Sequence, residues 1–75
     1  MKMIAVDSTP LRTVSYDAEL QLLQIEFQDR STYQYFDVPA AVWEALLQAP
    51  SKGAYFNRAI RQRFDYAPVE GVSLS

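Results

Sequence analysis

The chain has 75 residues, enough for one domain with one small core, and its seven basic and nine acidic side chains give a formal net charge of −2. It contains no cysteine and no histidine, which excludes disulfide bonds, thiolate or imidazole metal sites, and catalysis by a Ser-His or Cys-His pair. We therefore expect a single non-catalytic domain over residues 1–75, with no cofactor and no metal ion.

No targeting or membrane segment is expected. The apolar run before Asp7 is too short for a signal peptide, and no apolar run approaches the roughly 20 residues that span a bilayer. Ser8-Thr9-Pro10 is typical of a break in the chain. We expect a cytoplasmic protein in which residues 1–7 form a tail, either flexible or docked on the domain.

Three strands are predicted in the first half of the chain. Residues 12–16 place Val14 and Tyr16 two positions apart, and residues 23–27 alternate between apolar and polar side chains. Both patterns are typical of half-buried strands. Residues 32–38 return as the third strand, which ends at a Val-Pro pair.

The spacing between the second and third strands predicts their register. Residues that face each other in an antiparallel pair share one face of the sheet, so a shift by one residue would turn every side chain over. A three-residue loop over residues 28–30 pairs Ile25 with Tyr33 and Leu23 with Tyr35. The two tyrosines then lie on the apolar face, which the helices can cover, and glutamine and glutamate side chains lie on the opposite face.

The opposite face also has an apolar end. Leu22 and Phe36 lie there as neighbours in this register, with Leu20 close by. An uncovered apolar patch of this kind is typical of a partner or homodimer surface. Alternatively, one of the two tails lies across it with its apolar side chains, which are Met3, Ile4, Val6, Val69 and Val72.

Two helices are predicted in the second half of the chain. Pro39 suits the first turn of a helix over residues 39–49, and Pro50 ends it. Ser51 is a typical N-cap for a second helix. Apolar residues recur in that second segment at intervals of four, at Phe56, Ile60 and Phe64.

These elements predict an α+β domain. A three-stranded antiparallel meander is followed by two helices, which pack on one face of the sheet. The core of the domain is expected at about residues 8–66, between tails at residues 1–7 and 67–75.

Three motifs of the chain resemble the KTSC domain, a small bacterial domain that also occurs at the C-terminus of some lysyl-tRNA synthetases. They are Tyr33-Gln34-Tyr35, Val38-Pro39, and the run Ser-Lys-Gly-Ala-Tyr-Phe-Asn-Arg-Ala-Ile-Arg at residues 51–61. The resemblance extends over about residues 8–66. It implies an uncharacterised domain for which RNA binding has been suggested, with no enzyme activity and no cofactor.

The chain departs from that family in the hairpin before the tyrosine pair. Relatives often have glycine there, whereas this chain has Asp29-Arg30-Ser31. If the hairpin needs a left-handed backbone, Asp29 or Arg30 has to adopt it at some cost in strain.

The second helical segment carries four basic residues and no acidic residue between Ser51 and Phe64. The four are Lys52, Arg58, Arg61 and Arg63. A local excess of positive charge is typical of a phosphate-binding surface, so one hypothesis is that the domain binds RNA, either tRNA or single-stranded RNA. Alternatively, these charges surround a solvated helix face and form capping contacts or ion pairs with residues such as Asp37 or Glu44.

Three further residues are candidates for the same ligand surface. Tyr33 and Tyr35 could form a platform on which bases stack, and Asn57 could contact a ligand beside the apolar stripe of its helix. Alternatively, the tyrosines pack in the core, and Asn57 satisfies backbone groups of a loop. The competing hypothesis for function is protein–protein interaction or homodimerisation through Leu22 and Phe36.

Overall fold

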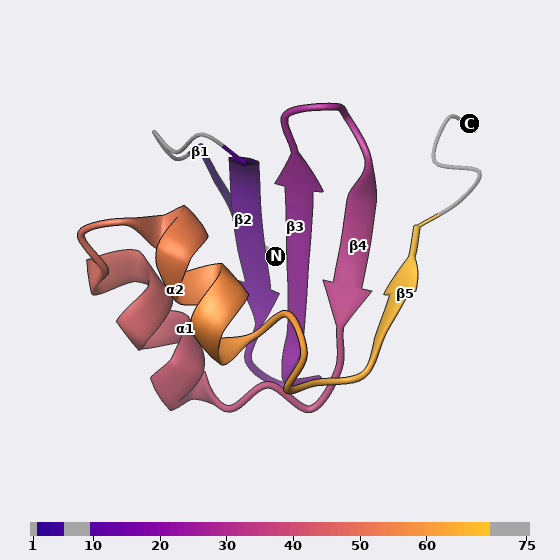
Figure 1. Ribbon diagram of the computed structural model, residues 1–75. Helices are drawn as coiled ribbons and strands as arrows, with labels where there is room; N and C mark the ends of the chain where they lie inside the picture. The colour runs from indigo at the N-terminus through magenta and orange to yellow at the C-terminus, as the bar shows by residue number, and fades with distance from the viewer. Residues whose placement is uncertain (1, 6–9, 70–75) are drawn as a thin grey trace.

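The computed structural model of the protein describes residues 2–5 and 10–69. Its strands and helices follow one another in the order β1 (Lys2–Ala5), β2 (Leu11–Asp17), β3 (Leu22–Phe27), β4 (Thr32–Tyr35), α1 (Ala40–Gln48), α2 (Lys52–Ala59) and β5 (Tyr66–Pro68). Neighbouring strands are antiparallel and lie in chain order across one sheet, from β1 at one edge to β5 at the other (Figure 1). The α+β class, the antiparallel sheet and the two helices are thus confirmed.

The sheet in the described part of the chain has five strands, whereas three were predicted. The additional strands are β1 and β5, which come from segments at or beside the expected tails, and each extends one edge of the predicted meander. Edge strands are held by backbone hydrogen bonds, such as the one from Val69 N to Thr32 O at 2.9 Å. Such bonds are available to any sequence except proline, so short edge strands leave a weak pattern in the side chains.

The predicted register of the central hairpin is correct. Ile25 lies opposite Tyr33, and Leu23 lies opposite Tyr35. The face that these residues share packs against the helices: Leu23 and Ile25 are fully buried, and Tyr35 contacts Phe56 of α2 with ring centroids 5.4 Å apart. The opposite face is polar, with Gln34 Nε2 donating to Gln24 Oε1 at 3.1 Å.

The hairpin loop places one residue in the left-handed region. Arg30 has φ 74°, and its N–H donates to Phe27 O at 2.9 Å while Phe27 N–H donates to Ser31 O at 2.8 Å. A three-residue loop of this kind combines a turn with a left-handed residue, a position that glycine fills without strain. Of the two residues considered for this position, Arg30 is the one that adopts it.

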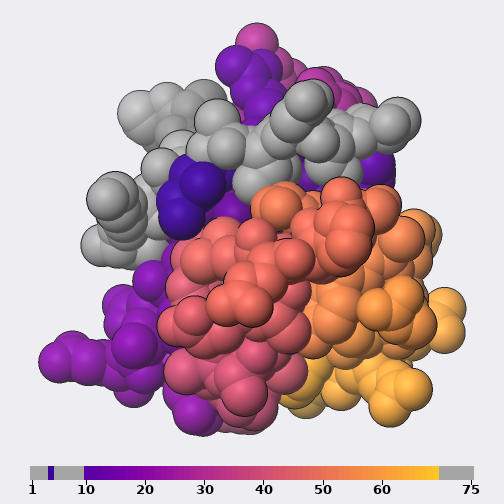
Figure 2. Space-filling model, turned by 90° about the vertical axis from the view of Figure 1, so that its left-hand side faces the viewer, coloured from indigo at the N-terminus to yellow at the C-terminus, as the bar shows by residue number. Residues whose placement is uncertain are grey.

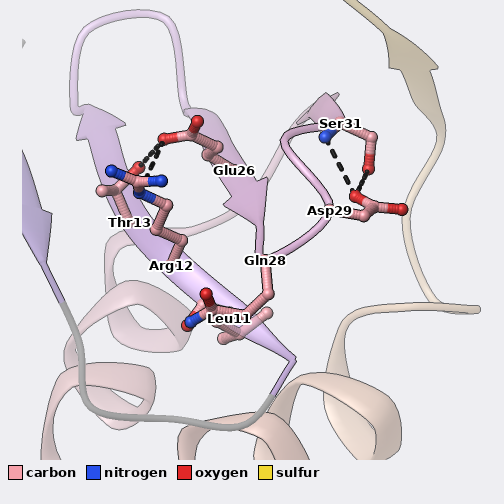
Figure 3. A network of polar contacts seen from close by, with 7 residues as sticks. All are labelled: Leu11, Arg12, Thr13, Glu26, Gln28, Asp29 and Ser31. Atoms are coloured by element: carbon pink, nitrogen blue, oxygen red, sulfur yellow. Dashed lines mark hydrogen bonds and ion pairs between the residues drawn. The ribbon is translucent and has the colours of Figure 1, made fainter.

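Polar contacts fix the same loop from both sides (Figure 3). Asp29 Oδ1 accepts hydrogen bonds from Ser31 Oγ at 2.6 Å and from Ser31 N at 2.9 Å, and these bonds lower the pKa of the Asp29 carboxyl. Gln28 Nε2 donates to Leu11 O at 3.0 Å. The hairpin end is therefore tied to the start of β2.

A bulge in β2 changes which of its side chains face the helices. Leu11 pairs with Phe27 whereas Thr13 pairs with Glu26, so Arg12 is an extra residue on the β2 side. Leu11 and Val14, three positions apart, are both fully buried as a result. Thr13 Oγ1 donates to Glu26 Oε1 at 3.3 Å, and Arg12 Nε lies 4.0 Å from the same oxygen (Figure 3).

The two helices lie side by side on the covered face of the sheet (Figure 2). α1 is anchored over β2 by Trp43, whose ring stacks on Tyr16 at 5.4 Å. The Tyr16 hydroxyl also donates to Val38 O at 2.5 Å, just before the helix begins. Leu46 of α1 and Phe56 of α2 complete the core on the helix side of the sheet.

The helix starts agree with the prediction, but α2 ends earlier than the apolar stripe indicated. Ser51 Oγ accepts a hydrogen bond from Ala54 N at 3.3 Å, as expected for an N-cap. The N–H groups of Ile60 and Arg61 both donate to Phe56 O, which closes the helix at Ala59. Arg61 and Arg63 therefore lie in the turn after α2 and are not part of the helix. After this turn the chain returns to the edge of the sheet as β5.

Candidate nucleic-acid interface

A groove opens where the end of α2 meets β4 and β5. Its volume is about 860 Å³, within the range of about 300–1,000 Å³ that is usual for ligand sites. In Figure 1 both helices lie on the β1–β2 side, and β5 forms the opposite edge. The groove is lined by Pro10, Phe27, Tyr33, Tyr35, Phe56, Asn57, Arg61, Gln62, Phe64, Asp65 and Tyr66.

Aromatic rings in mutual contact form the floor of this groove. The ring centroid of Tyr66 lies 5.7 Å from that of Tyr33 and 5.6 Å from that of Tyr35. Phe27 links the floor to α2, at 5.8 Å from Tyr33 and 5.5 Å from Phe56. These separations are typical of directly packed rings, so no slot remains between one ring and the next.

The three tyrosines of the floor differ in exposure. Tyr35 is a core residue, with 4% of its surface exposed, whereas Tyr33 is half-buried. Tyr66, which was not predicted as a site residue, is 56% exposed. Tyr35 therefore packs in the core, while Tyr33 packs partly against the core and lies with Tyr66 at the surface of the groove.

Burial raises the pKa of Tyr35 to about 12, because the phenolate is poorly solvated there. The positive charge of Arg61 opposes this rise, and Tyr66 and Tyr33 add to it. The guanidinium of Arg61 thus lies within electrostatic reach of the groove floor. At neutral pH the Tyr35 hydroxyl is protonated.

Asn57 and Arg61 form the polar rim on the α2 side. Arg61 donates from Nη1 to Asn57 Oδ1 at 3.3 Å, and both side chains are exposed. An arginine has five N–H donors, and this bond uses one of them. The pair therefore presents several N–H donors beside the aromatic floor, which suits an anionic or carbonyl-bearing ligand.

The other three predicted basic residues do not line the groove. Lys52 Nζ donates to Ala49 O at 3.2 Å and so caps the carboxyl end of α1. The Arg58 guanidinium lies over the Tyr55 ring, 5.4 Å from its centroid. Arg63 is exposed in the turn after α2. Of the seven predicted nucleic-acid contacts, four come together in the groove: Tyr33, Tyr35, Asn57 and Arg61.

The sequence analysis missed the contribution of residues 62–66 to the groove. Asp65 and Tyr66 lie there because Phe36 N donates to Asp65 O at 2.9 Å, which joins this segment to the end of β4. The aromatic residue at 66 and the proline at 68, two positions apart, were a weak signal for a short edge strand. Proline and the nearby tail residues made the segment look irregular.

The apolar patch on the other face is partly exposed. Leu20 is 67% and Phe36 37% exposed, while Leu22 is half-buried. Two residues that were expected to cover it lie elsewhere: Ile4 pairs with Val14 and packs against the core, and Val69 continues beyond β5. The expectation for Val6 and Val72 lies outside the described residues, as does the side chain of Met3.

The described residues contain neither a candidate metal site nor a candidate membrane-spanning helix. Within residues 2–5 and 10–69, no three acidic side chains are grouped so that they could hold a metal ion. No helix in the same part of the chain is long and apolar enough to cross a membrane.

Comparison with known families identifies the fold. The family model described as "KTSC domain" matches residues 7–64, which is more than half of the chain. The chain belongs to the KTSC domain family. The resemblance in its tyrosine, Val-Pro and second-helix motifs is thereby confirmed.

Members of this family occur alone and within larger proteins. An uncharacterized protein of Stutzerimonas stutzeri is 42% identical over 71 residues, which cover 93% of this chain and 100% of that protein. A lysine–tRNA ligase of Nostoc punctiforme is 39% identical over 64 residues, but these are only 11% of the ligase. The crystal structure of a KTSC domain protein from Yersinia pestis superimposes with a TM-score of 0.88 at 29% identity, covering 91% of this chain and 96% of that one.

Proposed function

We propose that this KTSC domain is a non-catalytic, cytoplasmic binding module for single-stranded RNA or for an unpaired segment of tRNA. The groove at the end of α2 supports the proposal best, because aromatic rings there adjoin a guanidinium and an amide. Proteins that bind single strands stack bases on aromatic side chains and contact the backbone with basic residues. Tyr33, Tyr66 and Arg61 offer both kinds of contact within one site.

The chemistry of the groove favours binding over catalysis. The chain has no histidine and no cysteine, so neither an imidazole base nor a thiolate nucleophile is present. Tyr35, with its pKa raised to about 12, is a poor proton donor and acceptor at neutral pH. The groove therefore offers surfaces and hydrogen bonds to a ligand and no activated group.

Two relatives favour tRNA among RNA ligands. Lysine–tRNA ligases of Nostoc punctiforme and Trichormus variabilis contain a segment that is 39% and 43% identical to this chain. The name of these enzymes says that they act on tRNA. A segment that adds RNA contacts is consistent with its presence in such enzymes.

The proposal predicts salt-dependent RNA binding. We expect the protein to bind a fluorescent single-stranded RNA and tRNA at low salt in an anisotropy titration. One phosphate contact, at Arg61, should weaken binding about twofold to threefold between about 50 and 200 mM salt, because bound counterions are released. Absence of binding to both RNAs at low salt would contradict the proposal.

A matched pair of variants locates the binding surface. Arg61→Gln removes a charge from the groove, whereas Arg12→Gln removes a charge from the opposite face, near Glu26. We expect the first change to lower RNA affinity and to reduce the dependence on salt, and the second to leave both nearly unchanged. Equal losses in the two variants would mean that the charge acts without a defined site.

The exposed apolar patch supports a second candidate function, protein interaction or homodimerisation. Leu20 and Phe36 expose large apolar side chains near the half-buried Leu22, and such patches are frequent at interfaces. If the patch joins two copies, sedimentation should show a dimer that Leu22→Glu and Phe36→Glu convert to a monomer. A wild-type protein that stays monomeric at high concentration would rule out the homodimer.

A further inference from the structure

Tyr66 offers the most exposed tyrosine ring of the groove to a ligand. The tyrosine rings touch one another at 5.6 and 5.7 Å, so a planar ligand cannot enter between them and must lie on an outer face. Tyr66 is 56% exposed whereas Tyr35 is 4% exposed. Tyr66, at the β5 edge, is therefore the ring on which a planar ligand has room to stack, with Tyr33 beside it.

The same contacts exclude an aromatic cage for a cation. Cages that recognise quaternary ammonium groups surround the cation with ring faces that stand apart from each other. Here the rings pack directly against one another, and the positive charge of Arg61 acts on the same floor. A cationic ligand would be repelled by this guanidinium, whereas an anionic group would be attracted.

The polar lining has two ends of different character. On the α2 side, Arg61 and Asn57 present N–H donors, with one hydrogen bond between them at 3.3 Å. In the segment that leads into β5, the acidic residue Asp65 also lines the groove, and its backbone O accepts a hydrogen bond from Phe36 N at 2.9 Å. A guanidinium binds phosphate, and a carboxylate accepts hydrogen bonds from an amino group.

We propose that the groove holds a single unpaired nucleotide, with its base on Tyr66, its phosphate at Arg61 and an amino group of the base at Asp65. This proposal rests on the proposed RNA-binding function and assigns the ligand unit of the same site. The volume of about 860 Å³ lies within the usual range of small-ligand sites and leaves room for a nucleotide. Adenine, cytosine and guanine carry an exocyclic amino group and uracil does not, so the site discriminates against uracil.

The experiment uses mononucleotides as probes on the full chain. Chemical shifts of the Tyr66 ring and the Arg61 side chain are followed by NMR during titration with adenosine monophosphate, uridine monophosphate, adenosine and inorganic phosphate. We expect adenosine monophosphate to bind more tightly than each of the other three probes. Equal binding of adenosine monophosphate and inorganic phosphate would overturn the stacking assignment.

Variants separate the three contacts. Tyr66→Ala should weaken adenosine monophosphate binding about fivefold to 100-fold, the range of one lost stacking contact, whereas Tyr66→Phe should bind like the wild type. Arg61→Gln should remove the advantage of adenosine monophosphate over adenosine, and Asp65→Asn its advantage over uridine monophosphate. Tyr55→Ala, which removes a ring that contacts Arg58 outside the groove, is the control.

The outcomes distinguish this inference from the proposed function. If RNA binds with the expected salt dependence but Tyr66→Ala leaves RNA and mononucleotide affinity unchanged, the nucleotide site is wrong and the RNA-binding function stands. If adenosine monophosphate binds at Tyr66 but neither RNA binds, the nucleotide site stands and the RNA-binding function falls. If neither class of ligand binds, both proposals are wrong.

Discussion

Tyr35 connects the core of the domain to its groove. Its ring packs on Phe56 at 5.4 Å and on Tyr66 at 5.6 Å, so the same side chain supports α2 and the groove floor. Burial raises its pKa from the ordinary value of 10.0 to about 12. The protonated phenol therefore contributes to stability, and the phenolate would remove that contribution.

This shift predicts a dependence of stability on alkaline pH. Below pH 10 Tyr35 is protonated in both the folded and the unfolded chain, so its contribution is fully present. As pH rises from 10 to about 12 the unfolded chain releases the proton first, and the free energy of unfolding falls. Tyr35→Phe lacks this group, so in urea unfolding the stability of the wild type relative to the variant should decline over that interval.

The variant keeps every other side chain of the chain, so the comparison isolates the Tyr35 hydroxyl. A stability difference between wild type and Tyr35→Phe that stays constant from pH 9 to pH 12 would contradict the assignment of the raised pKa to Tyr35.

Arg30 is the residue where the hairpin conformation and the side chain conflict. With φ 74°, its Cβ crowds the backbone in a way that glycine avoids. We expect Arg30→Gly to raise the free energy of unfolding by about 0.5–1 kcal/mol, since relief of this strain exceeds the added flexibility of the unfolded chain. The melting temperature should rise by a few degrees.

Arg30→Ala is the control for the Arg30→Gly prediction, because it removes the same charge but keeps the Cβ atom. It should leave the melting temperature close to that of the wild type. If both variants change stability equally, the charge of Arg30 matters and its backbone conformation does not.

At the scale of elements, β5 forms one edge of the sheet and has only three residues. Val69 N donates to Thr32 O and Phe36 N donates to Asp65 O, both at 2.9 Å. Because hydrogen-bonded pairs alternate in an antiparallel ladder, Ala67 faces β4 with its N–H, whereas Tyr66 and Pro68 direct their backbone groups outward. Proline thus lies where no N–H is needed, which also protects the edge from pairing with another chain.

Residues 67 and 68 should differ in how well they tolerate proline. Ala67→Pro removes a hydrogen bond to β4 and should lower the free energy of unfolding by about 1–3 kcal/mol. Pro68→Ala removes none and should change it by about 0.5 kcal/mol or less. Urea unfolding measures both, and an Ala67→Pro variant as stable as the wild type would mean that the N–H of residue 67 does not pair with β4.

At the scale of the whole molecule, Phe56 is one of the side chains that join the helix layer to the sheet. Phe56 of α2 is 3% exposed and contacts both Phe27 and Tyr35 of the sheet. Domains of this size have little stability in reserve, with about 5–15 kcal/mol in all for typical proteins. The loss of one such side chain is therefore a large fraction of the total.

We expect Phe56→Ala to lower the free energy of unfolding by about 3–5 kcal/mol, through lost burial and the cavity that remains. Phe36→Ala, at a position that is 37% exposed, should cost less than about 1 kcal/mol and serves as the matched control. Circular dichroism during urea unfolding measures both changes. Similar losses in the two variants would contradict the central role of Phe56.

Much of the inner fold follows from the sequence alone. The alternation through residues 23–27 and the three-residue loop determined the register of β3 and β4, because a period of two allows only one face to be buried. Ser51 and Pro39 marked the helix starts, because the Ser51 hydroxyl accepts a hydrogen bond from an N–H of the first turn, and proline lacks the N–H that would be unpaired there. The absence of histidine and cysteine excluded disulfide bonds, thiolate or imidazole metal sites, and catalysis by a Ser-His or Cys-His pair.

Only the tertiary structure decided where the groove lies and which residues line it. β1 and β5 are held by backbone hydrogen bonds, which carry little side-chain pattern, so their places at the edges could not be read from residue types. Arg61 and Tyr66 line the same groove because α2 ends at Ala59 and the chain turns back along β4. The residues that line the groove are brought together by the packing of the whole chain, whereas local sequence patterns determine the helices and strands themselves.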